Sequence, residues 1–335
     1  MPIPATYDYF PDHDGGGDKE KYKPVTWPHT FVTWSGSDGR IIPLTGDLTC
    51  RDNPAGIGIM WGPQAFDMPS YDVKADAIPN MDGSLFKSAR ATSRDVTIPI
   101  RIQALDRKSL IQLKQYLFHS LNPLRGPGRI TVTEGDGHPR HLECYYVDGA
   151  QGNEGRDQAG FYWITYALVF RAMDPYWYAN RHDQVEWHIY KDDAKPFLSD
   201  HFLPLQVGAT GFKPGDPVTV TNDSSLDCWP MWTVEGPISS MAVKNLTTGQ
   251  SFDFLDNFTI QVGEKVTIDT TPGVKSVILR DKKGEENLWP QVKPASAMWS
   301  LIPGDNQITI TGAEPGDATV VRVTYVPRYL SYSGG

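Results

Sequence analysis

Four carboxylates near the middle of the chain are the residues best suited to acid–base chemistry. They are Glu134, Asp136, Glu143 and Asp148. A glycosidase needs two such groups, one to protonate the leaving oxygen and one to attack or to activate water. However, Glu134 and Asp136 alternate with glycines in the sequence Glu-Gly-Asp-Gly, and these residue types are favoured by the shape of a turn. We therefore expect a hairpin turn here, and no catalytic residue is predicted.

Other enzyme motifs are missing from the sequence. It contains no Gly-x-Ser-x-Gly nucleophile elbow and no phosphate-binding loop pattern. Gly56, Gly58 and Gly62 do not match the dinucleotide-binding pattern, and no cysteine has an evident histidine partner. The sequence therefore predicts a protein that is not an enzyme and that carries no cofactor.

Histidines and acids at short spacing offer metal-site hypotheses. Residue types that bind zinc occur in two groups, His138 with His141, and His182 with Asp183, Glu186 and His188. In a strand, the two histidines and the glutamate of the second group would share one face. Acids of the N-terminal segment resemble a calcium loop, but their order does not fit its ligand pattern; they are Asp12, Asp14, Asp18 and Glu20. Solvent-exposed or interfacial histidines are the favoured interpretation, and no metal is predicted.

Tryptophans are the residues best suited to sugar binding, because their flat faces can stack on a sugar ring. The candidates in the middle of the chain are Trp163, Trp177, Trp229 and Trp232. Trp163 and Trp232 fall within strand patterns, where large aromatic side chains usually fill a core. Trp289 and Trp299 flank the loop at residues 290–294, and we expect them to be exposed and to contact a partner.

One helix is predicted, and it follows a strand. Apolar residues at every second position of 96–104 indicate a strand buried on one face. Asp106 can cap the next turn, Asn122-Pro123 ends the helix, and the core-facing stripe is Leu110, Leu113, Leu117 and Leu121. The polar positions of this helix face solvent or a neighbouring subunit; they are Lys108, Gln112, Lys114, Gln115 and His119.

The rest of the chain predicts a mainly β (α+β) protein with two domains. Residues 1–24 form an extended polar arm, 25–180 a first domain, 181–205 a connecting segment and 206–335 a β-sandwich. Hairpins are expected within 26–48 and between 129–133 and 139–147, and residues 161–171 are apolar enough to be covered on both faces. Residues 53–93 are expected to be rich in loops, with weak strands near 57–60 and 71–75.

Composition excludes several classes of protein. The formal net charge is −9 and no run of Lys and Arg occurs, so specific nucleic-acid binding is not expected. The three cysteines, Cys50, Cys144 and Cys228, are too sparse for a disulfide framework. No apolar stretch is long enough to cross a membrane, and no secretion signal is visible, so we expect a soluble protein made in the cytosol.

The order of these features resembles the Dit-like distal tail proteins of long, non-contractile-tailed phages, especially minor tail proteins of actinobacteriophages. In the first half the resemblance lies in residues 33–39 (TWSGSDG), 94–102 with the helix and Asn122-Pro123, 137–142 (GHPRHL), 146–149 (YVDG) and 174–177 (DPYW). In the second half it lies in 230–237 (PMWTVEGP), 263–270 (GEKVTIDT) and 301–306 (LIPGDN). The resemblance extends from about residue 27 to 325.

The resemblance implies a belt domain, a split β-barrel or sandwich with one helix, followed by a galectin-like β-sandwich. It also implies a hexameric ring at the distal end of the virion's tail. The implied partners are other copies of the chain, the tail tube protein, the tape measure protein and a tail-associated lysin or fibre hub protein. The implied role is a structural hub that supports host adsorption and DNA passage.

Two alternatives remain from the residues themselves. In the first, the C-terminal sandwich binds host-surface or cell-wall glycans through exposed aromatics. In the second, paired carboxylates make the chain a cell-wall hydrolase, and this alternative has the least support in the sequence.

Overall fold

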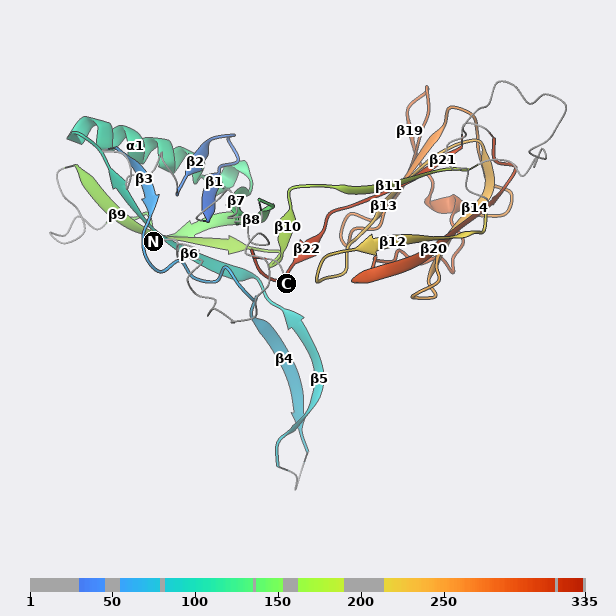
Figure 1. Ribbon diagram of the computed structural model, residues 1–335, viewed down its shortest axis with the longest axis horizontal. Helices are drawn as coiled ribbons and strands as arrows, with labels where there is room; N and C mark the ends of the chain where they lie inside the picture. Colours follow the sequence, from blue (N-terminus) through green and yellow to red (C-terminus); the bar gives the residue numbers. More distant parts are fainter. Residues whose placement is uncertain are drawn as a thin grey trace, which may run out of the picture. The chain divides into compact units, whose positions relative to one another are not determined.

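The computed structural model describes residues 30–45, 55–78, 82–134, 137–152, 162–189, 214–316 and 319–333. The chain divides into two compact units (Figure 1). The first ends at Asn180 and resumes at Tyr329, and the second is Arg181–Arg328. The expected N-terminal arm at 1–24 lies outside the described residues, as does the part of the expected connecting segment from 190 onward.

The first unit is built on a nine-stranded sheet. Its strands are β1 (Phe31–Ser35), β2 (Ile41–Pro43), β3 (Gly56–Ile59), β6 (Arg94–Gln103), β7 (Gly128–Thr133), β8 (Pro139–Asp148), β9 (Trp163–Ala172), β10 (Trp177–Ala179) and β22 (Arg328–Tyr329). The order is β2-β1-β7-β8-β9-β6-β3, with β10 beside β8 and β22 beside β10. The ends of this path approach each other, because the Ile59 amide donates to the Leu44 carbonyl at 2.8 Å. The sheet is therefore nearly closed, like a barrel.

Strand β6 confirms the alternating pattern read from the sequence. Val96, Ile98, Ile100 and Ile102 are fully buried, while the intervening side chains are more exposed. The expected hairpins β1–β2 and β7–β8 are also present.

Strand β9 differs from the expectation that both its faces are covered. Alternate residues such as Leu168 and Phe170 are buried, whereas those between them are partly or wholly exposed. Trp163 lies on the second face, where the guanidinium of Arg101 stacks over its ring at 4.9 Å. The prediction that Trp163 is a core residue is therefore wrong, because its register directs it away from the core.

Helix α1 (Arg107–Ser120) has the predicted start, stripe and end. Asp106 caps it, since its Oδ1 accepts a hydrogen bond from the Ser109 amide at 2.8 Å. The side chains of Leu110, Leu113, Leu117 and Leu121 are buried or partly buried against the core. The indole of Trp34 on β1 donates to Ser120 Oγ at 3.1 Å, which fixes the C-terminal end of α1. The short 3₁₀ helix η2 (Pro123–Arg125) follows.

Replacing Asp106 tests the importance of this cap. We expect Asp106→Ala to lower the melting temperature by about 2–4 °C, and Asp106→Asn, which can still accept the bond, to stay near the parent. The Ser109 amide lowers the pKa of the Asp106 carboxyl below its ordinary 3.8. The carboxylate thus contributes stability above pH 3.8 and loses it as the pH falls through the lowered pKa. Thermal melts between pH 2 and 7 should show this loss in the parent but not in Asp106→Asn; identical profiles would contradict it.

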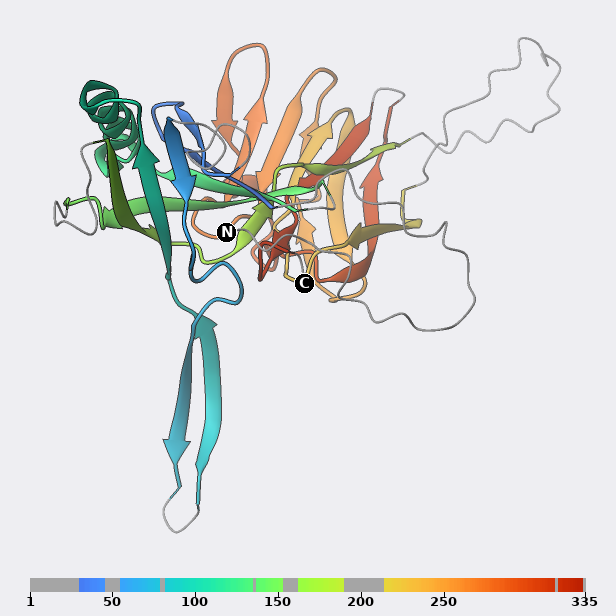
Figure 2. The same cartoon turned by 60° about the vertical axis from the view of Figure 1, so that its left-hand side comes forward.

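A long hairpin replaces the loop-rich stretch expected at 53–93. Strands β4 (Tyr71–Ala77) and β5 (Ser84–Ala91) pair with each other, with a bulge between Lys74 and Ala75. The hairpin projects away from the rest of the first unit (Figures 1 and 2). Among the described residues, no further strand pairs with either of its edges.

The second unit is the expected β-sandwich. One sheet has the order β11-β21-β13-β17-β18-β19, and the other has β12-β20-β14-β15 with β16 beside β14. The first sheet contains β11 (Asp183–His188), β13 (Met231–Glu235), β17 (Lys265–Asp269), β18 (Ser276–Arg280), β19 (Glu285–Asn287) and β21 (Val320–Tyr325). The second contains β12 (Pro217–Asn222), β14 (Ile238–Asn245), β15 (Ser251–Asp253), β16 (Thr259–Ile260) and β20 (Gly304–Ala313), and η3 (Trp289–Gln291) is a 3₁₀ helix of this unit. Strand β11 occupies part of the expected connecting segment.

Three tryptophans form part of the core of the second unit. Trp232 stacks with Trp187 at 6.2 Å and meets Trp299 edge to face at 5.5 Å between ring centroids. The core position predicted for Trp232 is confirmed. The exposure predicted for Trp299 is wrong, because only 2% of this residue is accessible.

The end of the chain returns to the first unit and is held there by two buried arginines. Arg94 donates to the carbonyls of Ala65, Phe66 and Leu330 at 3.0–3.2 Å. Arg140 donates to the Tyr332 carbonyl at 2.9 Å, and its guanidinium lies over the Tyr329 ring. Tyr329 is therefore part of the first unit's core, and Tyr332 packs against it.

Candidate functional site

The carboxylates considered for catalysis each have a different partner. Glu134 accepts from Thr30 Oγ1 at 3.0 Å, Glu143 pairs with Arg129 at 3.0 Å, and Asp148 accepts from the Gly149 amide at 2.7 Å. Asp136 lies outside the described residues. The other three are therefore held in separate turn and strand contacts.

The described cysteines are not reactive thiols. Cys144 and Cys228 are free and buried, and burial raises the pKa of each thiol above its ordinary value. A raised pKa keeps the thiol protonated, whereas nucleophilic attack requires the thiolate. Cys50 lies outside the described residues.

The histidines considered as zinc ligands have other contacts. His188 Nε2 lies 3.3 Å from Glu186 Oε1, but Glu186 also accepts two bonds from Arg322, which lower its pKa. His141 hydrogen-bonds to Asn180 and stacks on Tyr178. Within the described ranges, no group of three or more histidines, cysteines and acids is placed to hold a metal ion.

The polar helix positions predicted as subunit contacts lie on the surface. Lys108, Gln112, Gln115 and His119 are all exposed. The sequence interpretation overlooked apolar neighbours on the outer side of α1, since Ile111 and Phe118 are also partly exposed. Contact of these positions with another subunit remains a prediction.

The β4–β5 hairpin presents one apolar face. The cross-strand register and the bulge place most of the apolar side chains of both strands together; they are Tyr71, Val73, Ala75, Ala77, Phe86, Ala89 and Ala91. Leu85 is the exception, because it pairs with Asp76 on the opposite face. Val73 is 59% exposed and Phe86 is 62% exposed, so nothing among the described residues covers this face.

The opposite face of the hairpin is charged. Asp72 pairs with Arg90 and Asp76 pairs with Lys87, and Lys74 lies between them. Opposite charges across a strand pair stabilise the hairpin and favour solvent on that side. A hairpin with one charged, solvated face and one exposed apolar face is suited to pack against another protein surface.

The sequence contained a signal for this surface. Tyr71, Val73, Ala75 and Ala77 alternate with charged residues, which is the period of a strand with one apolar face. The bulge interrupts the register with β5, and the alanines have low strand propensity. For these reasons the pattern predicted only a weak strand.

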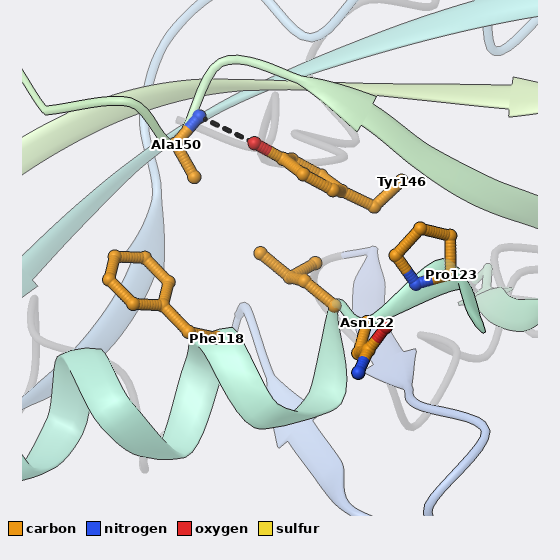
Figure 3. A pocket seen from close by; sticks show the side chains of 6 residues that line it. Phe118, Asn122, Pro123, Tyr146 and Ala150 are labelled. Carbon is orange, nitrogen blue, oxygen red and sulfur yellow. Dashed lines mark hydrogen bonds between the residues drawn. The ribbon is translucent and has the colours of Figure 1, made fainter. Parts of the chain in front are cut away.

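A shallow apolar groove lies where α1 ends (Figure 3). Its lining residues are Phe118, Leu121, Asn122, Pro123, Tyr146 and Ala150. Tyr146 turns its ring toward the groove and its hydroxyl accepts a hydrogen bond from the Ala150 amide at 2.9 Å. Leu124, the residue after Pro123, is 93% exposed. The groove offers an apolar recess beside an apolar rim.

Of the two tryptophans expected to contact a partner, Trp289 is exposed and Trp299 is not. Trp289 begins η3 and is 41% exposed. Of the two tryptophans expected to be exposed, the glycan-binding alternative therefore retains Trp289 and loses Trp299. In the part of the chain that the structure describes, no helix has the length and apolar character needed to span a membrane.

Comparisons with known proteins agree with the resemblance read from the sequence. Residues 223–329 match the family described as siphovirus-type tail component, C-terminal domain. No match was found among curated protein sequences. The fold is similar to the Dit protein (gp 19.1) of phage SPP1, described as a paradigm of the hub adsorption apparatus of phages that infect Gram-positive bacteria. That match has a TM-score of 0.59 and 12% identity, and covers 89% of this chain and 99% of that one.

A second solved structure has the same fold. It is a chain of the phage P2 baseplate in its activated conformation, with a TM-score of 0.50 and 10% identity, and the match covers 90% of this chain and 99% of that chain. At such identities the likeness establishes the fold. Together with the family match, it confirms the predicted mainly β architecture and the predicted resemblance to siphophage distal tail proteins.

Proposed function

We propose, on the premise that residues 223–329 belong to the siphovirus-type tail component family, that this chain is a structural hub protein of a phage tail tip. The similar solved structures are a hub protein and a baseplate chain, and neither is described as an enzyme. The chain's own carboxylates, thiols and histidines offer no assembled catalytic or metal centre among the described residues. In this proposal the chain acts by positioning other tail proteins, and it is located at the distal end of the tail.

The finer proposal is that the first unit closes a hexameric ring. The observation that carries it is the β4–β5 hairpin, whose apolar face and two edges are not covered by any of the described residues. A two-stranded hairpin has little stability of its own in water, so a neighbour that covers it would stabilise it. A second copy of the chain is the simplest neighbour, because head-to-tail contacts between identical subunits close into a ring.

The ring would join the tail tube to the proteins of the tip. The tail tube protein and the tape measure protein lie on one side, and a tail-associated lysin or fibre hub protein lies on the other. DNA passes through the central opening, and the C-terminal sandwiches offer surfaces for adsorption proteins. These roles come from the resemblance to distal tail proteins.

Sizing of the purified full chain tests the ring. We expect mass photometry to give a closed multimer, six copies by the resemblance, and negative-stain class averages to show a ring with a central opening. If the chain alone is monomeric, the same measurement should be made after mixing it with tail tube protein. A chain that stays monomeric in both conditions would contradict the proposal.

A further inference from the structure

Four of the six residues that line the groove at the end of α1 lie in a cationic stretch of the chain. Residues 107–133 contain five Lys and Arg and no Asp or Glu, although the whole chain has a net charge of −9. Lys114 lies one helical turn before Phe118, and the exposed Arg125 lies two residues after Pro123. An apolar recess whose neighbours in the sequence are cations would match a segment that carries both apolar anchors and acids.

The N-terminal segment of this chain has that composition. Residues 7–14 read Tyr-Asp-Tyr-Phe-Pro-Asp-His-Asp, with three aromatic residues, three aspartates and no Lys or Arg. Aromatic side chains are effective anchors because they bury a large area at a small cost in conformational entropy.

The segment is long enough to reach the groove. The structure begins at Thr30, and the sixteen residues from Asp14 to Thr30 span at most about 55 Å when extended. A compact domain of this size has a radius of gyration of only roughly 16 Å. The same length lets the segment reach the groove of its own chain or of a neighbouring copy.

We propose that residues 7–14 bind in the groove formed by Phe118, Leu121, Pro123, Tyr146 and Ala150. Aromatic residues of the segment fill the recess, and its aspartates face Lys114 and Arg125. The acid nearest to Ala150 in sequence is Asp148, which already accepts bonds from the Gly149 amide and the Gln151 side chain. Binding would cover Leu121, Phe118 and the exposed apolar rim at Leu124.

Photo-cross-linking in the full chain tests this placement. Phe10 is replaced by benzoylphenylalanine, a larger aromatic residue that reacts with nearby C–H bonds under light, and cross-linked peptides are identified by mass spectrometry. We expect the cross-links to fall within residues 118–124 and 146–150. The charge reversal Lys114→Glu with Arg125→Glu should lower the cross-link yield at low salt at least about tenfold.

A compensating change and a control make the test specific. Reversing the charge of the segment with Asp8→Lys, Asp12→Lys and Asp14→Lys should restore the cross-link yield in the variant that carries Lys114→Glu and Arg125→Glu. The exposed Lys275 of the second unit, changed to Glu, should leave the yield unaltered. The proposal would be overturned if the cross-links mapped mainly to the β4–β5 hairpin or to the second unit. It would also be overturned if Lys114→Glu with Arg125→Glu left the cross-link yield unchanged.

The same experiment distinguishes this proposal from the ring. In a mixture of isotope-labelled and unlabelled chains, mixed cross-links place the segment on a neighbour and unmixed ones place it on its own chain. Either result supports the groove as the binding site. A monomeric chain with cross-links at the groove would contradict the ring and leave this proposal intact.

Discussion

Two aspartates on the apolar face of the β4–β5 hairpin are expected to prevent assembly while the chain stays folded. Val73 and Phe86 are more than half exposed in the single chain, so Val73→Asp with Phe86→Asp should leave the melting temperature nearly unchanged. In an assembled ring the two carboxylates would be buried without partners, which is costly. We expect the association constant between subunits to fall at least about 1,000-fold, equal to about 4 kcal/mol.

Mass photometry over a range of concentrations measures this effect. The matched control changes two residues on the opposite face, Lys74→Asp with Ser88→Lys, which face each other across the strands, so that the new side chains carry opposite charges. This control should assemble as the parent does. If the Val73 and Phe86 variant forms the parent's multimer at the parent's concentration, the apolar face is not the subunit contact.

Replacement of Arg94 by Met is expected to be the most destabilising single change in the first unit. Its guanidinium is buried and serves three carbonyls, including that of Leu330 in the returning C-terminal residues. Burial lowers the pKa of Arg94 to about 10, so the group is still charged at neutral pH. Met cannot replace these three part-buried hydrogen bonds from a charged donor, although the Phe66 carbonyl keeps another donor, the Trp177 indole. The loss should cost about 3–5 kcal/mol of unfolding free energy.

Chemical denaturation and hydrogen exchange measure the two consequences of Arg94→Met. The exchange of the amides at 329–333 should rise even under conditions in which the second unit stays protected. Arg90→Met is the control, because Arg90 is exposed in the hairpin and its pair with Asp72 is at the surface, where such pairs contribute little. Equal stability of the two variants would show that the C-terminal residues are not held by Arg94.

The parts of the fold that could be predicted are those with strong local signals. Strand β6 alternates Val and Ile with residues that, apart from Pro99, are polar, and α1 has its cap at Asp106, its leucine stripe and its stop at Pro123. Each signal lies within a few residues of the structure that it specifies. Local propensity and tertiary packing agree at these positions, which is why the sequence alone sufficed.

The parts that could not be predicted depend on distant contacts. Trp299 lies beside a loop rich in proline, and only its packing against Trp232 on β13 decides that it is buried. Trp163 has a strand pattern around it, but the register with β6 decides which face it occupies. The anchoring of Leu330 by Arg94 joins residues 236 positions apart, and no pattern within a window of sequence contains that information.

The candidate surfaces were less predictable than the fold for a related reason. The polar positions of α1 were identified, but an exposed apolar face cannot be told from a core face by periodicity alone. The hairpin and the groove could be identified only from the structure, which shows which apolar side chains are exposed to solvent. Val73 and Phe86 are identified as a candidate contact surface by their exposed fractions and not by their residue types.

The most direct measurement is an image of an intact tail that carries a labelled copy of this chain. A gold or antibody label on the C-terminal sandwich should appear at the distal end of the tail, repeated around the axis in a ring between the tube and the tip. Label along the tube, at the head end, or at a single site off the axis would contradict a ring-forming hub.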